Sequence, residues 1–418
     1  MPLIVLFLVA LFSYIDRSLI SVLQVPIKTE LGLSDAQLGA LTGLAFALVY
    51  AIAAVPLARV LDRGKRTLIM AIALTVWSLM TAATSLAAGF AALVVCRIGV
   101  ALGEAVSLPG THSLFADYYP LQRRGRAFAV WALAAPVGIM LGLSVGGWLG
   151  HDLGWRKSFA IVGLSGLVLV PLLLILKEPP RGQFEDGGAA AAREAQPPLK
   201  NALLALWRIR SFPPLVCAAT LQTFGYGVLT NWDAPFFSRV HHMPLHQLAT
   251  TVALIIGVGA GAGAMASGPI LDVIGRHDKR WYAWAPAISM LLTAPLAIAQ
   301  FLVGCVQLSI AFGLAAAVAG AFFVVPTNVA VQSMVSPRMR AFTASILLLV
   351  PTIIGHGVGP WITGLTSDLL AAHFGLGDQA IRYAASLWVL TSTVGGVILL
   401  FIGKGIARDM MARNRPPL

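Results

Sequence analysis

Long apolar segments recur along the whole chain, and they limit its fold more than any other feature of the sequence. A helix needs roughly 20 apolar residues to cross the hydrocarbon core of a bilayer. Runs close to that length lie near residues 3–25, 37–61, 67–88, 90–114, 126–150, 158–176, 213–238, 247–271, 281–301, 304–335, 340–369 and 384–406. The sequence therefore predicts an all-α integral membrane protein with twelve transmembrane helices.

The composition agrees with lipid as the solvent of this chain. Hydrophobic residues make up 58% of the sequence and charged residues only 11%, whereas soluble domains carry about 25% charged residues. The net charge of +12 comes from basic residues in the short gaps between apolar runs, and such a distribution is typical of membrane topology. We therefore expect a monomer with the lipid bilayer as its partner and no binding to nucleic acid.

Lys and Arg residues are distributed unequally between alternate gaps. One set of gaps, together with the C-terminus, holds 21 basic residues and the opposite set holds 5. Cytoplasmic loops carry the excess of Lys and Arg in membrane proteins. The sequence therefore predicts a multi-pass protein with both termini in the cytoplasm, which requires an even number of spans.

Two halves of the chain repeat each other. Residues 268–276 are similar in sequence to residues 58–66, 210 positions earlier. Residues 340–342 are similar to residues 126–128, 214 positions earlier. Internal repeats of this kind are typical of secondary transporters. The expected organisation is an N-terminal six-helix bundle at 1–176, a cytoplasmic linker at 177–212 and a C-terminal six-helix bundle at 213–418.

These repeated loops resemble the major facilitator superfamily. The run Asp62-Arg63-Gly64-Lys65-Arg66 is similar to the G-x-x-x-D-R-x-G-R motif of that superfamily, with Ala58 at the place of its first glycine and Lys65 at that of its second. Arg97 with Gly103 resembles its fourth-helix arginine motif. The resemblance implies the major facilitator fold, two pseudo-symmetric bundles that work by alternating access.

A finer resemblance is to the Spinster-like family. It rests on residues 14–17, 33–39, 45–52 and 103–105. Spinster-like proteins include transporters of sphingosine-1-phosphate and lysophospholipids. The resemblance implies a proton-coupled bacterial member in the inner membrane that carries a lipid with an anionic head group. Anion:cation symporters of the same superfamily also carry an Asp-Arg pair in the first span, so uptake of a small organic anion, such as a carboxylate or sugar acid, is the alternative.

Four charged residues lie within the first and fourth predicted spans. They are Asp16, Arg17, Arg97 and Glu104. A charge at mid-bilayer costs roughly 3 kcal/mol unless it faces a cavity or a partner, and the family resemblance places both spans beside the central cavity. We expect Asp16 and Glu104 to carry the coupling proton, and Arg17, Arg97 and Glu104 to bind substrate. A static cluster of salt bridges that orients the helices is the alternative.

Other candidate substrate-binding residues are aromatic or polar side chains in helices that the resemblance places at the cavity. They are Trp131, Phe224, Asn231 and His356. Aromatic residues in such helices favour an amphiphilic substrate. An aromatic belt at the membrane interface is the alternative for the seventh span, and a packed polar group is the alternative for His356.

Charges in the repeated loops are candidates for a gate. Asp62 can pair with a cytoplasmic arginine such as Arg126, and Asp272 can pair with Arg340 in the same way. Such pairs would close the cytoplasmic side and break as the two halves rock. The full predicted gating set is Asp62, Arg63, Arg66, Arg126, Asp272, Arg276 and Arg340. Charge that sets topology alone is the alternative.

Other classes of protein are not favoured by the sequence. An enzyme would need a nucleophile with its base, or metal ligands, and the spans show neither a convincing triad nor an HExxH motif. A Walker A motif for ATP-driven transport and the repeated pore loop of a channel are also absent from the sequence. We therefore expect no catalytic activity, no cofactor and no metal site.

Overall fold

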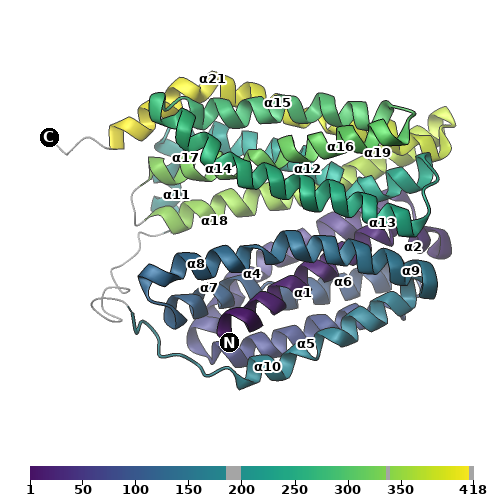
Figure 1. Cartoon of the computed structure of the whole chain (residues 1–418), viewed down its shortest axis with the longest axis horizontal. Helices are drawn as coiled ribbons and strands as arrows, with labels where there is room; N and C mark the ends of the chain where they lie inside the picture. Colours follow the sequence, from purple (N-terminus) through teal and green to yellow (C-terminus); the bar gives the residue numbers. More distant parts are fainter. Residues whose placement is uncertain (185–198, 336–338, 414–418) are drawn as a thin grey trace. The chain divides into compact units, whose positions relative to one another are not determined.

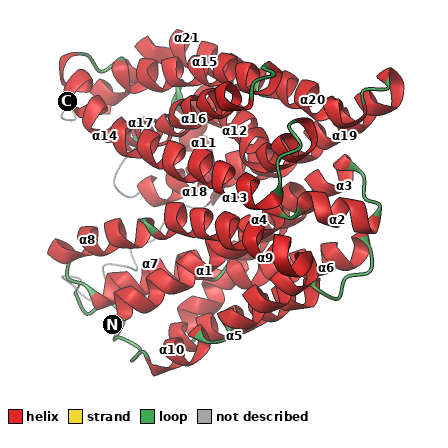
Figure 2. Ribbon diagram, turned by 45° about the vertical axis from the view of Figure 1, so that its right-hand side comes forward, coloured by secondary structure: helices red, strands yellow, loops and turns green. Residues whose placement is uncertain are grey.

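The computed structural model describes residues 1–184, 199–335 and 339–413, and within these ranges the chain forms helices and no strands (Figures 1 and 2). Of the expected linker at 177–212, residues 185–198 lie outside the described residues. The chain divides into two compact units, Met1–Ala195 with His242–Ala253, and Gln196–His241 with Leu254–Leu418.

The first unit is built around the two helices with the most mutual contact, α1 and α9. Its helices are α1 (Pro2–Val22), α2 (Gln24–Leu31), α3 (Asp35–Gly39), α4 (Ala45–Arg63), α5 (Arg66–Thr84), α6 (Phe90–Glu104), α7 (Ser107–Tyr118), α8 (Leu121–Ala132), α9 (Ala134–Gly166), α10 (Leu169–Ile175) and α13 (Leu245–Ala253). A π-helical turn, Ala40–Leu44, joins α3 to α4. The unit includes α13, which the expected division assigns to the C-terminal bundle.

The second unit packs α12 and α15 against α21. Its helices are α11 (Leu199–Arg208), α12 (Phe212–Val240), α14 (Ala260–His277), α15 (Trp281–Leu302), α16 (Val306–Phe322), α17 (Val324–Met334), α18 (Arg340–Pro351), α19 (Gly359–Phe374), α20 (Ala380–Trp388) and α21 (Leu390–Arg413). The π-helices Leu254–Gly259 and Thr352–Val358 precede α14 and α19, and a short 3₁₀ turn, Gly377–Gln379, precedes α20.

Ten helical segments of the described chain are long and apolar enough to cross a membrane. One of them, Gln122–Ile175, is 54 residues long and contains the two expected spans 126–150 and 158–176. The expected span at 213–238 corresponds to α12, which is 29 residues long and contains polar residues such as Gln222. The prediction of an all-α membrane protein with many spans is confirmed.

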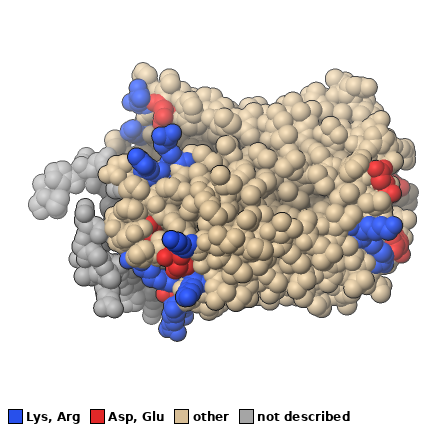
Figure 3. All heavy atoms as spheres, turned by 60° about the horizontal axis from the view of Figure 1, so that its bottom comes forward, with Lys and Arg blue, Asp and Glu red and all other residues tan. Residues whose placement is uncertain are grey.

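Charged atoms gather at two opposite ends of the face shown in Figure 3, and the band between them contains no Lys, Arg, Asp or Glu atoms. Such a band suits the hydrocarbon core of a bilayer, because an exposed charge is costly there.

Several spans are interrupted where proline or glycine weakens the helical hydrogen bonding. The π-helix Thr352–Val358 follows directly on Pro351, and the break between α8 and α9 at Leu133 lies three residues before Pro136. Inside α9, Gly154 takes a φ of +81°, which favours glycine. Such interruptions are commonly found at functional bends in helices.

Glycines of α9 hold α1 at close range. A methyl group at Gly138 would lie 2.7 Å from the carbonyl oxygen of Leu11, and one at Gly142 would lie 2.6 Å from that of Ile15. Small residues let two membrane helices approach closely. This contact fixes the position of the stretch of α1 that carries Asp16 and Arg17.

Replacing Gly142 with alanine is therefore expected to destabilise the first unit. The added carbon would meet backbone atoms of α1, and overpacking of this kind costs about 1–3 kcal/mol. Gly125→Ala is the matched control, because Gly125 also lies in a helix but a methyl group there would meet nothing within 4 Å. Thermal unfolding of the solubilised protein measures both variants, and equal melting temperatures would contradict the close packing.

Candidate functional site

A buried carboxylate of α6 binds two side chains of α1. Arg17 Nε donates to Glu104 Oε2 at 2.5 Å, and Ser13 Oγ donates to the same oxygen at 2.8 Å. Ser13 and Arg17 are one helical turn apart, so both face α6. Glu104 is 0% exposed. The structure thus brings together two of the four charges that the sequence singled out.

The local sequence places Glu104 at the end of a helix that packs tightly on α5. Glu104 is the last residue of α6, and a new helix begins at Ser107. A methyl group at the preceding Gly103 would lie 2.7 Å from the carbonyl oxygen of Ala73 in α5. Only a glycine therefore allows α6 to approach α5 at this level.

Asp16 is on another face of α1 from Arg17, and its hydrogen bond goes to α5. It is 1% exposed and accepts a hydrogen bond from Thr81 Oγ1 at 2.8 Å. Its other oxygen, Oδ1, has no hydrogen-bond partner among the described residues, and neither has Nε of Arg97. Both side chains line a small cavity of about 10 Å³, roughly the space for one water molecule.

Aromatic rings of α1 and α4 surround the two arginines. The guanidinium carbon of Arg17 lies 4.7 Å from the ring centroid of Phe46, and that of Arg97 lies 4.5 Å from the same ring. The rings of Tyr14 and Tyr50 also lie near Arg17, at 5.6 and 5.0 Å. Each cation over a ring gains roughly 0.5–2 kcal/mol. The rings thereby hold both cations without neutralising their charge.

Arg17 is the one member of the charged cluster that is more than slightly exposed. Its side chain is 30% exposed, whereas Asp16, Arg97 and Glu104 are buried. The cluster can therefore present a positive charge to a ligand while it keeps both carboxylates away from water.

Trp131 of α8 lies in the same unit and packs against α7. Its ring contacts the imidazole of His112 edge to face, with centroids 5.5 Å apart. Its indole Nε1 is buried and has no hydrogen-bond partner among the described residues. A donor of this kind is available to a ligand.

The other predicted binding residues belong to the second unit. Phe224 is buried against Trp388, with ring centroids 5.5 Å apart. Asn231 Nδ2 donates to the carbonyl oxygen of Gly227 at 2.8 Å. His356 lies in the π-helix Thr352–Val358, and a methyl group at Gly227 would lie 3.5 Å from its Cα atom. Asn231 and His356 thus both lie close to Gly227 of α12.

This unit also contains a buried carboxylate, which is paired with an amide side chain. Asp233 of α12 is 1% exposed and accepts a hydrogen bond from Gln300 Nε2 of α15 at 2.8 Å. Its partner is neutral, in contrast to the arginine that binds Glu104. The carboxylate in the run of polar and aromatic residues at 226–236 is the signal in the sequence that points to this position.

Arg66, one of the predicted gating residues, is held entirely within the first unit. It is buried, and it pairs with Asp117 of α7 and, at 2.6 Å, with Glu178. Its guanidinium also donates to Ser113 Oγ at 2.9 Å and to the carbonyl oxygen of Pro179 at 3.0 Å. The sequence reasoning missed these partners, although Asp117 near the end of the fourth span was a visible signal.

Glu178 lies outside the spans and takes a low pKa from this contact. Its partial burial alone would raise the pKa of the carboxyl, but hydrogen bonds from the Arg66 side chain and the Thr67 amide outweigh that effect. The pKa of Glu178 is therefore below its ordinary value. The ion pair with Arg66 persists at any pH at which Glu178 is ionised.

The remaining gating residues whose side chains the structure describes lie at the surface. Those with described side chains are all exposed: Asp62, Arg63, Arg126, Asp272 and Arg276. Among the described residues no ion pair joins Asp62 to Arg126, so the latch between them stays a prediction. The side chain of Arg340 lies outside the described part of the chain.

Comparison with known proteins identifies the family. The model of the Major Facilitator Superfamily matches residues 6–360. An MFS-type efflux pump of Mycolicibacterium smegmatis is 32% identical over 417 residues, which cover 98% of this chain and 94% of the pump. A probable L-galactonate transporter of Escherichia coli is 32% identical over 166 residues, 40% of this chain and 36% of that protein.

A solved structure matches the whole chain. It is the crystal structure of a bacterial homologue of the human lysosomal transporter Spinster, in an inward-facing and unoccupied conformation. The two chains are 28% identical with a TM-score of 0.85, and the match covers 100% of this chain and 98% of the other. The predicted likeness to Spinster proteins is confirmed. The chain is a multi-pass membrane transporter that belongs to the major facilitator superfamily.

Proposed function

We propose that this chain is a proton-coupled secondary active transporter that works by alternating access and carries an amphiphilic lipid with an anionic head group. One observation carries the proposal: the fully buried Glu104 accepts hydrogen bonds from Ser13 and from the partly exposed Arg17. A buried carboxylate in contact with an accessible cation is an arrangement that can exchange a proton for an anion.

The exchange follows from the charges. While Glu104 is ionised, it holds the Arg17 guanidinium at 2.5 Å. A proton on Glu104 removes that attraction and frees Arg17 to bind two oxygens of a phosphate or carboxylate in its fork. Asp16 and Arg97 are a second carboxylate and cation, beside a small cavity that Glu104 and Arg17 do not line. We assign to Asp16 a second proton-binding role that acts on transport only through Glu104.

The lipid as substrate is supported by the aromatic and apolar surroundings of the two arginines. Phe46 covers both arginines, so an anion that approaches them meets aromatic surface as well as charge. Trp131, Phe224, Asn231 and His356 are the further residues to which we assign substrate contacts.

A small organic anion, such as a carboxylate or sugar acid, is the second candidate substrate. It is favoured by the probable L-galactonate transporter, whose similarity is restricted to 40% of this chain. The same arginine fork would bind a sugar acid, so the cluster alone suits both substrates.

The rest of the organisation is proposed on the charge distribution. We assign the protein to a bacterial inner membrane as a monomer with both termini in the cytoplasm, and with bundles at 1–176 and 213–418 joined by a linker at 177–212. We assign a gating role at the cytoplasmic side to the charged residues of the repeated loops: Asp62, Arg63, Arg66, Arg126, Asp272, Arg276 and Arg340.

A flux assay in vesicles tests the substrate. Purified protein in liposomes is offered a lysophospholipid, sphingosine-1-phosphate or galactonate, with and without a pH gradient. We expect gradient-dependent movement of the lipids. Arg17→Gln should lower the apparent affinity for the lipid roughly tenfold or more, as the loss of a charge-assisted hydrogen bond does.

Arg156→Gln is the matched control, because Arg156 also pairs with a glutamate at 2.8 Å, but that glutamate, Glu30, is 48% exposed whereas Glu104 is buried. Its transport should equal that of the unmodified protein. Gradient-driven movement of galactonate alone would establish the second candidate, and an unchanged affinity in Arg17→Gln would remove Arg17 from the binding site.

A further inference from the structure

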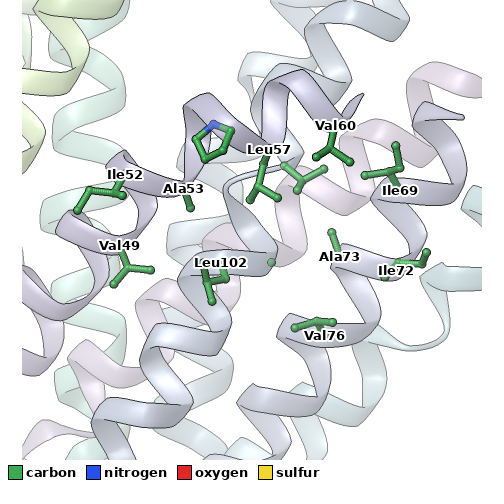
Figure 4. Close-up of a pocket in the computed structure, with 13 residues that line it drawn as sticks. Val49, Ile52, Ala53, Leu57, Val60, Ile69, Ile72, Ala73, Val76 and Leu102 are labelled. Atoms are coloured by element: carbon green, nitrogen blue, oxygen red, sulfur yellow. The ribbon is translucent and has the colours of Figure 1, made fainter. Parts of the chain in front are cut away.

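An apolar groove runs along the outer surface of the first unit, separate from the charged cluster. It has a volume of about 720 Å³, within the range of sites that bind drug-sized ligands. Its walls are α4 from Val49 to Val60 and α5 from Ile69 to Val76, and Leu102 and Gly103 of α6 complete it. Figure 4 shows that the labelled side chains from these three helices carry only carbon atoms.

The groove is open to the outside. The side chains of Ile52, Val60 and Ile72 that line it are all at least half exposed. All three helices lie within segments that are apolar enough to span a membrane, or directly continue one. A surface of this kind at membrane depth is in contact with the acyl chains of lipids.

Basic residues stand at one end of the groove. Its walls end at Val60 and Ile69, and the exposed Arg59, Arg63 and Lys65 lie within one helical turn of these two residues. The exposed Asp62 is the only acidic residue in the same stretch, 59–69. This end of the apolar groove therefore carries a net positive charge. An anionic amphiphile is complementary to it, because its negative head group would meet the basic residues while its acyl chain fills the groove.

The groove shares two helices with the charged cluster. Val49 lines the groove, and the next residue, Tyr50, lies 5.0 Å from the Arg17 guanidinium. Gly103 lines the groove, and the next residue, Glu104, accepts the hydrogen bond from Arg17. An occupant of the groove would thus support both helices that position the cluster.

We propose that this groove binds an anionic phospholipid of the surrounding bilayer, with an acyl chain between α4 and α5 and its head group beside Arg59 and Lys65. Each basic residue near a membrane surface contributes a preference for anionic lipid of roughly fivefold. The lipid holds α4 in place and so supports transport. The binding stands on the groove alone, whereas the effect on transport rests on the proposed function.

Photochemical cross-linking tests the binding directly. A benzoylphenylalanine at Ile72 places a reactive group in the groove, and the full-length protein is reconstituted with equal amounts of phosphatidylglycerol and phosphatidylcholine. We expect roughly 25-fold more cross-linking to phosphatidylglycerol, because the fivefold preferences of Arg59 and Lys65 multiply. Arg59→Gln and Lys65→Gln should each reduce that preference about fivefold. A probe at Leu79, which is exposed on the same helix but does not line the groove, should show no such preference.

A second variant fills the groove. Val76→Trp should lower cross-linking to both lipids at Ile72, whereas Leu79→Trp should not; elution from a sizing column shows that both are folded. Equal cross-linking to the two lipids at Ile72, or a preference that survives both charge substitutions, would overturn the proposal.

Transport measurements separate this proposal from the function itself. In vesicles that contain phosphatidylglycerol, Val76→Trp should lose the extra transport that this lipid supports, and Leu79→Trp should retain it. Selective cross-linking without any transport would remove the proposed function and leave the lipid site standing. Normal transport in every vesicle, independent of phosphatidylglycerol, would remove the supporting role of the lipid.

Discussion

Glu104→Gln is expected to abolish the pH dependence of transport while the protein remains folded. Glutamine keeps the shape of the side chain and can still accept hydrogen bonds from Ser13 and Arg17, but it cannot exchange a proton. Coupling between two ligands is typically worth about 1–3 kcal/mol, or roughly 5- to 150-fold in affinity. The effect of protons on the apparent affinity for substrate should fall from that range to none.

Glu30→Gln is the matched control for this substitution. Glu30 also pairs with an arginine, Arg156 at 2.8 Å, but both side chains are exposed. Water already solvates an exposed carboxylate, so the loss of its negative charge has little effect on the protein. We expect Glu30→Gln to keep the pH dependence of the unmodified protein, and a pH profile of Glu104→Gln that matches it would remove Glu104 from the coupling mechanism.

Arg66→Gln is expected to cause the largest loss of stability among substitutions in the first unit. Arg66 is 1% exposed and binds two carboxylates, those of Asp117 and Glu178. Removing one partner of a buried ion pair costs about 3–5 kcal/mol, because the opposite charge is left buried without compensation. Thermal unfolding in detergent measures the loss, and Arg63→Gln, an exposed neighbour in the same loop, should change stability by no more than about 0.5 kcal/mol.

The contribution of Glu178 to this contact has a predictable pH dependence. Its pKa is lower in the folded protein than in the unfolded chain, so the folded state binds fewer protons at acidic pH. The stabilisation is therefore complete above the ordinary glutamate pKa of about 4.3 and is lost as the pH falls through the lower folded value. Glu178→Gln should remove that acid sensitivity, and an unchanged loss of stability between neutral and acidic pH would contradict the assignment.

The sequence predicts the spans well because their signal is physical and strong. A segment of about 20 apolar residues in contact with lipid must form a helix, because only then are all its backbone groups hydrogen-bonded. The length of each apolar run is therefore enough to predict a transmembrane helix. Some breaks in the helices can also be predicted from the sequence. Pro351, for example, indicates a bend where the π-helix Thr352–Val358 begins. The break after Glu104, which divides the expected span 90–114, also has a signal in the sequence, because Pro109 in the first turn of α7 has no N–H to donate to the carbonyl oxygen of Ala105.

The members of the charged cluster could be predicted, but their pairing could not. Charges in an apolar run stand out, so Asp16, Arg17, Arg97 and Glu104 were evident. Which of them meet depends on how each helix is turned about its axis, and helices that are apolar on all sides carry no periodicity to fix that turn. The structure was needed to show that Glu104 binds Arg17 and that Thr81 binds Asp16.

The same limitation explains the contacts of the loop that follows α4. Sequence reasoning assigned Asp62 and Arg66 to one gating set because they belong to one motif. In the structure Asp62 is exposed, while Arg66, the first residue of α5, points inward to Asp117. Neighbouring residues in a sequence motif can thus differ in burial and in partners, which the motif itself does not show.

The movement of protons that accompanies the substrate tests the central claim most directly. Vesicles that hold the protein and a pH-sensitive dye in their lumen are given a lysophospholipid, and lumenal pH is followed as the lipid moves. We expect a pH change in step with lipid movement for the unmodified protein, and none for Glu104→Gln although that variant still binds the lipid. Lipid movement by the unmodified protein at full rate with no change in lumenal pH would contradict it.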